Sequence, residues 1–403
     1  MASARPCAAR IRELSAMPAP CKNTPLAVVE PQMEELFHAP FNAALLHAVL
    51  LAYPETPISF RAFPGHVQAV RAILDEHAPA LAAKVEWRVV PHAPGNTLPG
   101  RWRRSARATR EVLDHARRSQ ERILFCSISR MQLLQLKRAM RPTDQVRTVL
   151  HGDLDQIEHP LREAFPQRLF SLERVLQRPH PLGLRYLLLG DSIRDHIPPR
   201  LQNLLPHSGV IDHPYHFLPL QPPPPGPPIF GIFGNCGDGR LLETVARTVK
   251  SSSPGIRFRL VGFVADRQAA ERLRPFVENV ETHPLLRETF RQRAETITYA
   301  LWLAPPNSFR LRASGTFFDA LAYAKPLIYI ANPYIDAYFT TTSAPGTRCS
   351  TLDDVAAAVQ SAAATHNPAA YTTQQAAIAR LRERFSPIAL AGHLPAALDW
   401  NHL

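Results

Sequence analysis

The chain has 403 residues, 45% hydrophobic and 20% charged, which is enough to bury two cores and argues against a disordered protein. Its formal net charge of +12 at pH 7 admits an anionic partner: nucleic acid, a membrane surface or a phosphorylated small molecule. Five scattered cysteines without a CxxC pair argue against a disulfide framework or a zinc knuckle, and no run of about 18 apolar residues is present to span a membrane.

Residues 1–31 contain prolines and small residues without a continuous apolar core, so we expect a disordered tail rather than a secretory signal. Strands and helices then alternate. Helices are predicted at 41–51, 66–81, 101–120 and 129–140, and strands at 58–62, 85–90, 123–127, 146–150 and 186–189. This alternation is typical of a parallel sheet wound with helices, and it predicts a first, acceptor-side domain at 32–220.

A run of prolines interrupts this pattern near the middle of the chain. Residues 222–228 read Pro-Pro-Pro-Pro-Gly-Pro-Pro, which can neither continue a helix nor donate hydrogen bonds to a sheet, so we predict a linker at 221–228. A second domain at 229–372 then repeats the strand–helix pattern. The expected fold class is α/β, with two Rossmann-like, doubly wound domains that face each other across a cleft. Ligands of such sheets bind beyond the carboxyl ends of the strands.

The segment 308–328 bears most directly on function. It reads as a loop, a helix start, a short helix and a buried strand. Ser314 is a good N-cap, Gly315 lets another group approach the backbone, and the free amides of a helix start attract anions. Arg310 and Arg312 in the loop can add charge-assisted hydrogen bonds to a diphosphate. An ordinary capped helix before a core strand fits the same residues.

This segment resembles the donor-binding segment of GT-B glycosyltransferases, the retaining families especially. Asp319-Ala320-Leu321-Ala322 matches the Glu-Ala-Met-Ala part of the family's helix, and the Ala-Lys-Pro-Leu-Ile of 324–328 matches the strand start that follows. The family's acidic residue binds the ribose of the donor nucleotide, so the resemblance implies this role for Asp319. It also implies that Ser314, Gly315 and Thr316 bind the donor. Where the family often has a second glutamate, eight residues earlier, this chain has Leu311.

A glycine-rich turn follows the first strand of the second domain. Residues 231–240 read Gly-Ile-Phe-Gly-Asn-Cys-Gly-Asp-Gly-Arg, which departs from the G-x-G-x-x-G spacing of a dinucleotide fingerprint and disfavours a dinucleotide oxidoreductase. A tight strand–helix turn explains these glycines without a ligand. The turn also resembles the loop near the donor phosphates in GT-B C-terminal domains. That resemblance implies donor contacts for Gly234, Asn235, Gly237 and Arg240.

Histidine is the candidate for the catalytic side of the site. His151 follows a predicted strand, and GT-B transferases often place a histidine there, facing the acceptor and the donor sugar. The resemblance therefore implies a catalytic role for His151, while a loop histidine with a structural bond remains the alternative. His38 and Asn42 are candidates for the acceptor side. The 17 histidines show no H-E-x-x-H or similar spacing, so we expect neither a metal nor a cofactor.

Three further segments complete the interpretation. His213 and His216 flank Pro214-Tyr215 near the linker and are interpreted as hinge structure. An amphipathic helix is predicted at 373–385; the resemblance implies that 373–403 crosses back to the first domain, and a terminal surface helix is the alternative. The arginine-rich stretch 101–110 predicts either a solvated helix face or contact with an anionic membrane.

Together these features favour a metal-independent glycosyltransferase of the hexosyltransferase type. It would transfer a sugar from a nucleotide-sugar donor to a saccharide or lipid-linked acceptor, as in polysaccharide biosynthesis. In GT-B enzymes helix dipoles and basic side chains take up the charge of the leaving diphosphate. A nucleotide-sugar epimerase of the same fold and a non-catalytic nucleotide-sugar binding protein remain alternatives. We expect a cytoplasmic protein, possible peripheral contact with the inner membrane face, and no nucleic-acid partner.

Overall fold

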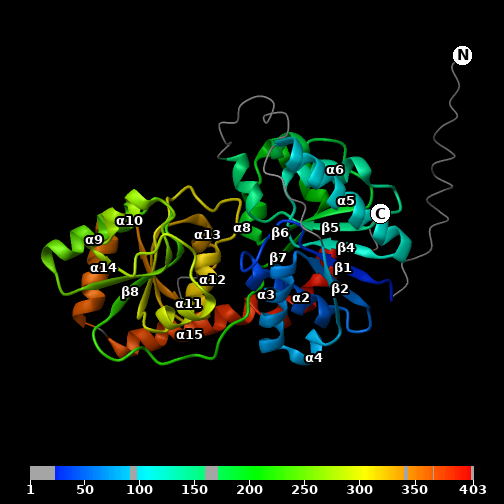
Figure 1. Cartoon of the computed structure of the whole chain (residues 1–403). Coiled ribbons are helices and arrows are strands. Elements are labelled where there is room, and N and C mark those ends of the chain that lie inside the picture. Colours follow the sequence, from blue (N-terminus) through cyan, green and yellow to red (C-terminus); the bar gives the residue numbers. More distant parts are fainter. Residues whose placement is uncertain (1–22, 91–97, 159–170, 340–343, 366, 401–403) are drawn as a thin grey trace, which may run out of the picture.

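The computed structural model describes residues 23–90, 98–158, 171–339, 344–365 and 367–400. Over these residues the chain forms two sheets with helices packed against them (Figure 1). The first sheet has the strand order β3-β2-β1-β4-β5-β6-β7 and the second the order β10-β9-β8-β11-β12-β13. All strand pairs within both sheets are parallel. The predicted α/β fold with two doubly wound, Rossmann-like domains is therefore confirmed.

The first domain is built on short strands that are mostly buried. Its strands are β1 (Leu26–Val29), β2 (Ile58–Ala62), β3 (Val85–Val89), β4 (Arg122–Phe125), β5 (Val146–Val149), β6 (Leu184–Leu189) and β7 (Ser208–Ile211). Its helices are α2 (Ala39–Ala52), α3 (Pro64–His77), α4 (Pro79–Ala82), α5 (Leu98–Ser119), α6 (Arg130–Ala139), η1 (Gly152–Ile157), α7 (Leu172–Leu176), α8 (Asp191–Asp195) and η3 (Pro199–His207).

The second domain repeats this plan. Its strands are β8 (Ile229–Asn235), β9 (Arg257–Phe263), β10 (Val277–Glu278), β11 (Tyr299–Trp302), β12 (Leu327–Ile330) and β13 (Gly346–Cys349). The helices that follow β8 are α9 (Arg240–Ser252), α10 (Arg267–Leu273), α11 (Arg287–Glu295), α12 (Gly315–Ala322), α13 (Pro333–Asp336), α14 (Leu352–Thr365), α15 (Pro368–Phe385) and α16 (Pro387–Leu398).

Strand β1 corrects the prediction of a disordered tail at 1–31. Its four residues are fully buried and pair with β2 on one side and β4 on the other, in the interior of the first sheet. A central parallel strand is covered on both faces, so it shows an unbroken apolar run instead of alternation, and Leu-Ala-Val-Val is too short to stand out between two prolines. Residues 1–22 of the predicted tail lie outside the described residues.

The segment between Ile211 and Ile229 joins the sheets and packs against the second domain and α15. The backbone amide of Tyr215 donates to the Phe385 carbonyl at 3.0 Å, and Arg382 of α15 donates to the Leu218 carbonyl at 2.9 Å. A spacer of prolines alone, as predicted at 221–228, accounts for only the second part of this connection. The first part, 212–218, is held by specific hydrogen bonds.

The end of the chain returns to the first domain as two helices, α15 and α16, where one helix was predicted (Figure 1). Pro387 begins α16, which packs along α2 and against β7. Buried Arg147 of β5 fastens this end: its guanidinium donates to the carbonyls of Leu398 and Asp399 and lies 4.4 Å from the centre of the Trp400 ring. The chain thus passes between the two domains twice, at 212–228 and again where α15 leads into α16.

Candidate functional site between the domains

Both sheets reverse their strand order at an equivalent point, between β1 and β4 in the first domain and between β8 and β11 in the second. The carboxyl ends of strands at such a switch point are where doubly wound sheets bind ligands. The candidate residues other than His151 lie at the ends of these strands, in the loops that follow them or in the helices that begin after those loops, and His151 follows β5. The loop after β11 leads into α12, and the loop after β8 leads into α9.

The start of α12 is a well-formed helix N-terminus. Ser314 caps it, because its Oγ accepts a hydrogen bond from the Phe317 amide at 3.3 Å, and the Trp302 indole of β11 donates to the same Oγ at 3.0 Å. Gly315 is exposed, and a Cβ placed there would meet no atom within 4 Å. The space beside Gly315 at the first turn of α12 is therefore open, as an anion site there requires.

The glycine loop after β8 lies against this helix start. Gly234 has φ of 72°, and a Cβ there would lie 2.5 Å from Cγ2 of Thr316, so only glycine fits. Asn235 accepts from the Gly237 amide at 3.0 Å and so shapes the loop. Arg240 opens α9 with its side chain 78% exposed, 3.4 Å from Asp238. The structure thus brings Gly234 and Thr316 together and leaves Arg240 facing solvent.

Arg310 and Arg312 bridge the two domains. Arg310 Nη1 lies 3.3 Å from Glu158 Oε1, and Arg312 Nη1 lies 3.4 Å from Asp155 Oδ2, at η1 of the first domain. The Arg312 guanidinium also covers the Phe309 ring at 4.3 Å. In this arrangement the charges of both arginines are paired with carboxylates instead of being free for a diphosphate.

Asp319 lies one helical turn after Gly315, so both residues share one face of α12. Its Oδ1 accepts a hydrogen bond from the Tyr215 hydroxyl at 2.5 Å. Burial raises the pKa of this carboxyl to about 6, since within the described residues no basic side chain forms an ion pair with it. Asp319 is therefore directed toward the segment that connects the domains, where it meets a single phenol.

Three histidine rings lie together on the first-domain side, of which His213 is buried and the other two are partly buried. His151, at the end of β5, has its ring centre 4.2 Å from that of His38 and 5.6 Å from that of His213. Burial lowers the pKa of His38 to about 4 and of His213 to about 3, and that of His151 well below its ordinary value, so all three are neutral at pH 7. Each keeps a buried ring nitrogen with no hydrogen-bond partner: His38 Nδ1, His151 Nε2 and His213 Nδ1.

His213 was interpreted as hinge structure, and in the structure its side chain also contacts residues of the candidate site. Its ring stacks on Phe318 of α12 at 4.2 Å with an angle of 13° between the planes, and it contacts Phe41 at 4.7 Å. His213 thus connects the histidine rings of the first domain with the helix that carries Asp319. The sequence signal for this contact was available: three aromatic or imidazole residues, at 213, 215 and 216, directly after a strand.

Asn42 is buried in the first domain and does not reach the surface of the candidate site. It is fully buried, and its Nδ2 is 3.2 Å from Glu30 Oε2 and 2.8 Å from His66 Nε2. Glu30 follows β1 and accepts hydrogen bonds from the Ser127 hydroxyl, which follows β4. This network, missed by the sequence analysis, fixes the loop between β1 and His38. In this arrangement Asn42 supports the acceptor side without reaching it.

Within the described residues no group of three or more His, Cys, Asp or Glu side chains is arranged to hold a metal ion. The same residues include no helix whose length and apolarity would let it cross a membrane. On α5 the exposed Arg107 is paired with Glu111, and the side chain of Arg101 lies outside the described part of the chain.

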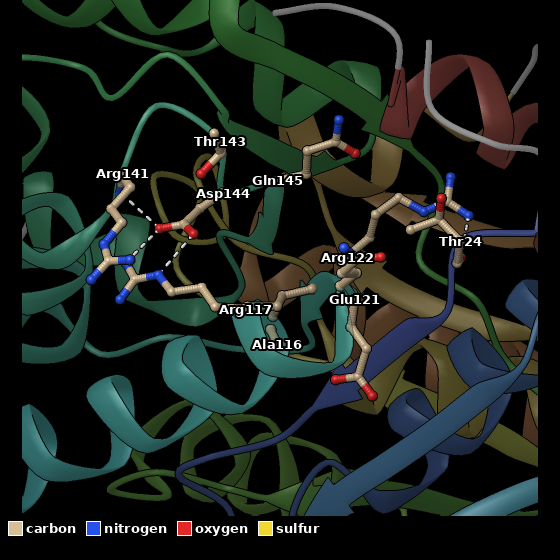
Figure 2. Close-up of a pocket in the computed structure, with 11 residues that line it drawn as sticks. Thr24, Ala116, Arg117, Glu121, Arg122, Arg141, Thr143, Asp144 and Gln145 are labelled. Carbon is tan, nitrogen blue, oxygen red and sulfur yellow. Dashed lines mark hydrogen bonds and ion pairs between the residues drawn. The ribbon is translucent and has the colours of Figure 1, made fainter. Parts of the chain in front are cut away.

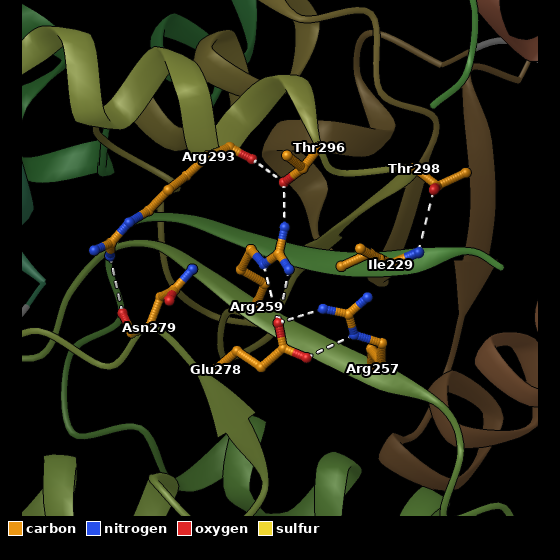
Figure 3. A network of polar contacts seen from close by, with 8 residues as sticks. All are labelled: Ile229, Arg257, Arg259, Glu278, Asn279, Arg293, Thr296 and Thr298. Atoms are coloured by element: carbon orange, nitrogen blue, oxygen red, sulfur yellow. Dashed lines mark hydrogen bonds and ion pairs between the residues drawn. The ribbon is translucent and has the colours of Figure 1, made fainter. Parts of the chain in front are cut away.

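A cavity of about 430 Å³ lies away from the candidate site, at the amino ends of β4 and β5 (Figure 2). Arg117 and Arg122 line it together with Asp144, which Arg117 contacts at 2.7 Å. A second polar network, at the amino end of β9, joins Arg257 and Arg259 to Glu278 (Figure 3). Asp144 pairs with Arg117, and Glu278 pairs with both Arg257 and Arg259, so we assign these ion pairs to the stability of the sheets. Arg122 donates to the Thr24 carbonyl and lies 5.1 Å from the centre of the Trp400 ring.

No protein-family model matches the chain, and no curated protein matches it in sequence. Several solved structures are similar in fold. The sucrose-phosphate synthase from Thermosynechococcus elongatus has a TM-score of 0.61 at 14% identity, over 93% of this chain and 98% of its own. HepE from Anabaena, in complex with UDP and glucose, has a TM-score of 0.64 at 12% identity, over 94% of this chain and 100% of its own. A glycosyltransferase from Rickettsia africae has a TM-score of 0.63 at 11% identity, over 94% and 98%.

These similarities extend over nearly the whole of each chain, across both sheets and the segment that joins them. The chain therefore has the GT-B glycosyltransferase fold, as its sequence predicted.

Proposed function

We propose that this protein is a glycosyltransferase that moves a sugar from a nucleotide diphosphate sugar to a saccharide or lipid-linked acceptor, without a metal ion. The observation that carries the proposal is the arrangement around α12. It combines an open helix N-terminus at Gly315, the Gly234 loop against it and the Asp319 carboxylate on the same helix face. His213 stacks on Phe318 of this helix and lies 5.6 Å from His151, which is paired with His38.

The chemistry follows from what a nucleotide diphosphate sugar presents. Its diphosphate needs amides and positive charge, which the first turn of α12 supplies through its free amides and dipole. Its ribose offers two neighbouring hydroxyls, which a carboxylate such as Asp319 can accept. As the sugar–phosphate bond breaks, negative charge develops on the diphosphate, and fixed donors at the helix start would stabilise it.

The histidines suit the sugar end of the donor and the acceptor. His151 and His38 are neutral, and each has a ring nitrogen without a partner, so they can accept or donate a hydrogen bond to a hydroxyl group. Their low pKa values make them weak bases. We therefore give His151 a role in orienting the transferred sugar and His38 a role on the acceptor side. HepE, of similar fold, binds UDP and glucose, which supports a nucleotide-sugar donor here.

A non-catalytic nucleotide-sugar binding protein is the second candidate. Leu311 stands where the retaining families often have a second glutamate, and it is completely buried. A donor site without that acid can still bind the nucleotide. Turnover of the donor in the presence of acceptors separates the two functions.

Thermal melting with a panel of UDP-, GDP- and ADP-sugars tests the proposal. A ligand that binds only the folded state raises the melting temperature by mass action. We expect one nucleotide class to raise it, and we expect release of that nucleotide diphosphate when saccharide acceptors are added. Binding without release over a broad acceptor panel favours the non-catalytic alternative. A wild-type protein that binds none of the three classes contradicts both.

A further inference from the structure

The segment that connects the domains touches the proposed donor helix through Tyr215. Its hydroxyl donates to Asp319 Oδ1 at 2.5 Å, its ring centre lies 5.9 Å from that of Phe318, and its backbone amide donates to the Phe385 carbonyl. The ring and the hydroxyl thus contact α12, and the backbone is held by α15. These contacts give the hydroxyl a defined position beside Asp319.

Asp319 depends on this single bond. Among the described residues, only Tyr215 forms a hydrogen bond with the Asp319 side chain, and no basic side chain forms an ion pair with Asp319. Leaving a buried carboxylate without a cation costs free energy, so a protein keeps one where it has a use. Oδ1 is occupied by the phenol, and Oδ2 has no donor from the described chain.

We infer that Tyr215 is a positioning residue for the nucleotide: it fixes Oδ1 of Asp319 so that Oδ2 is presented to the ribose hydroxyls. This inference rests on the proposed donor site at α12. Because Tyr215 belongs to the connecting segment and Asp319 to the second domain, the carboxylate is correctly placed only when that segment lies as it does here. Nucleotide affinity therefore depends on the position of the connecting segment against α12.

Tyr215→Phe tests the inference, with calorimetric titration of UDP, GDP and ADP. Loss of one hydrogen bond to a charged group predicts about tenfold weaker binding of the nucleotide that the wild type binds. Tyr329→Phe is the matched control. Its hydroxyl also donates to an aspartate, Asp336 Oδ1 at 2.9 Å, in the same domain, and we expect unchanged affinity.

The pH profile of binding gives a readout that a merely structural tyrosine would not move. The Tyr215 hydrogen bond lowers the pKa of Asp319 against the effect of burial, and Tyr323 and Arg287 are the other titratable groups that face this pair. Its removal raises that pKa, so the pH below which nucleotide binding declines shifts upward in Tyr215→Phe. Tyr329→Phe should keep the wild-type profile.

Combination with Asp319→Asn completes the test. If the tyrosine acts through the carboxylate, Tyr215→Phe has a smaller effect on affinity in the Asp319→Asn background than in the wild type, because the charge that it positions is absent. Independent, additive effects of the two changes overturn the inference, as does a Tyr215→Phe variant with wild-type affinity and pH profile. In either case the wild type still binds a nucleotide, and the proposed function stands. A wild type that binds none of the three nucleotides overturns the inference together with the proposed function.

Discussion

Replacement of Asp319 by asparagine distinguishes a carboxylate that binds the nucleotide from one that only stabilises the fold. The change keeps the shape of the side chain and one carbonyl acceptor for the Tyr215 hydroxyl, and it removes the negative charge. In our proposal the charge is used by the ribose hydroxyls of the nucleotide. A structural carboxylate, by contrast, would be needed by the protein itself, and its loss would lower stability.

The expected magnitude follows from the hydrogen bonds to the ribose. A hydrogen bond to a charged group contributes about 1.5–3 kcal/mol, so the loss of one such bond weakens nucleotide binding roughly 10- to 150-fold. Stability should not fall. Burial raises the pKa of Asp319 to about 6, so the native state binds more protons than the unfolded state between about pH 4 and pH 6. Stability from this group therefore decreases as pH rises through that window, and at pH 7 the neutral amide removes an unfavourable buried charge.

The same pKa sets the pH dependence of binding. Only the ionised carboxylate accepts hydrogen bonds from both hydroxyls, so wild-type affinity should decline as pH falls below about 6, and Asp319→Asn should lose this decline. Calorimetric titration from pH 5 to 8 and urea denaturation at pH 7 measure both quantities. Asp336→Asn, at the other tyrosine–aspartate pair, serves as the control with unchanged affinity. Lower stability together with unchanged nucleotide affinity in Asp319→Asn would refute the reasoning.

Three further predictions concern the start of α12, the arginines that bridge the domains and the buried Arg147. Gly315→Val should abolish nucleotide binding and leave the melting temperature within a few degrees of wild type, because the valine side chain enters open space. Gly392→Val, at an equally open position, is the control. Normal nucleotide binding by Gly315→Val would contradict a diphosphate at α12. The double variant Asp155→Asn, Glu158→Gln removes the carboxylate partners of the two arginines that bridge the domains, so nucleotide affinity at low salt should rise. Weaker nucleotide binding would mean that these ion pairs do not compete with the diphosphate. Arg147→Met removes the guanidinium donor of the Leu398 and Asp399 carbonyls and should lower the free energy of unfolding by about 3 kcal/mol, measured in urea. A loss below about 1 kcal/mol would show that the chain end contributes little to stability.

The sequence predicted the fold well where elements carry their own pattern. The strand–helix alternation from residue 58 onward gives two doubly wound sheets because helix period and buried strands are local signals. Strand β1 was missed for a physical reason. It is stabilised almost entirely by its neighbours β2 and β4, which are distant in sequence, so four apolar residues carry too little information by themselves.

Part of the local geometry at the candidate site could be predicted from the sequence. The capped start of α12 and the left-handed glycine turn after β8 follow from N-cap and glycine chemistry, which acts within a few residues. The partners of Arg310, Arg312 and Asp319 could not be predicted, because they come from the other domain or the connecting segment. Such pairings depend on how the domains dock, which no local pattern encodes.

A crystal structure of the protein with the nucleotide diphosphate that raises its melting temperature tests the central claim most directly. The account predicts the diphosphate within hydrogen-bond distance of the first amides of α12, close to Gly315 and Gly234, and both ribose hydroxyls on the Asp319 carboxylate. The nucleotide would then lie between α12 and His151. A nucleotide bound away from α12, or one bound there with Asp319 turned from the ribose, would contradict it.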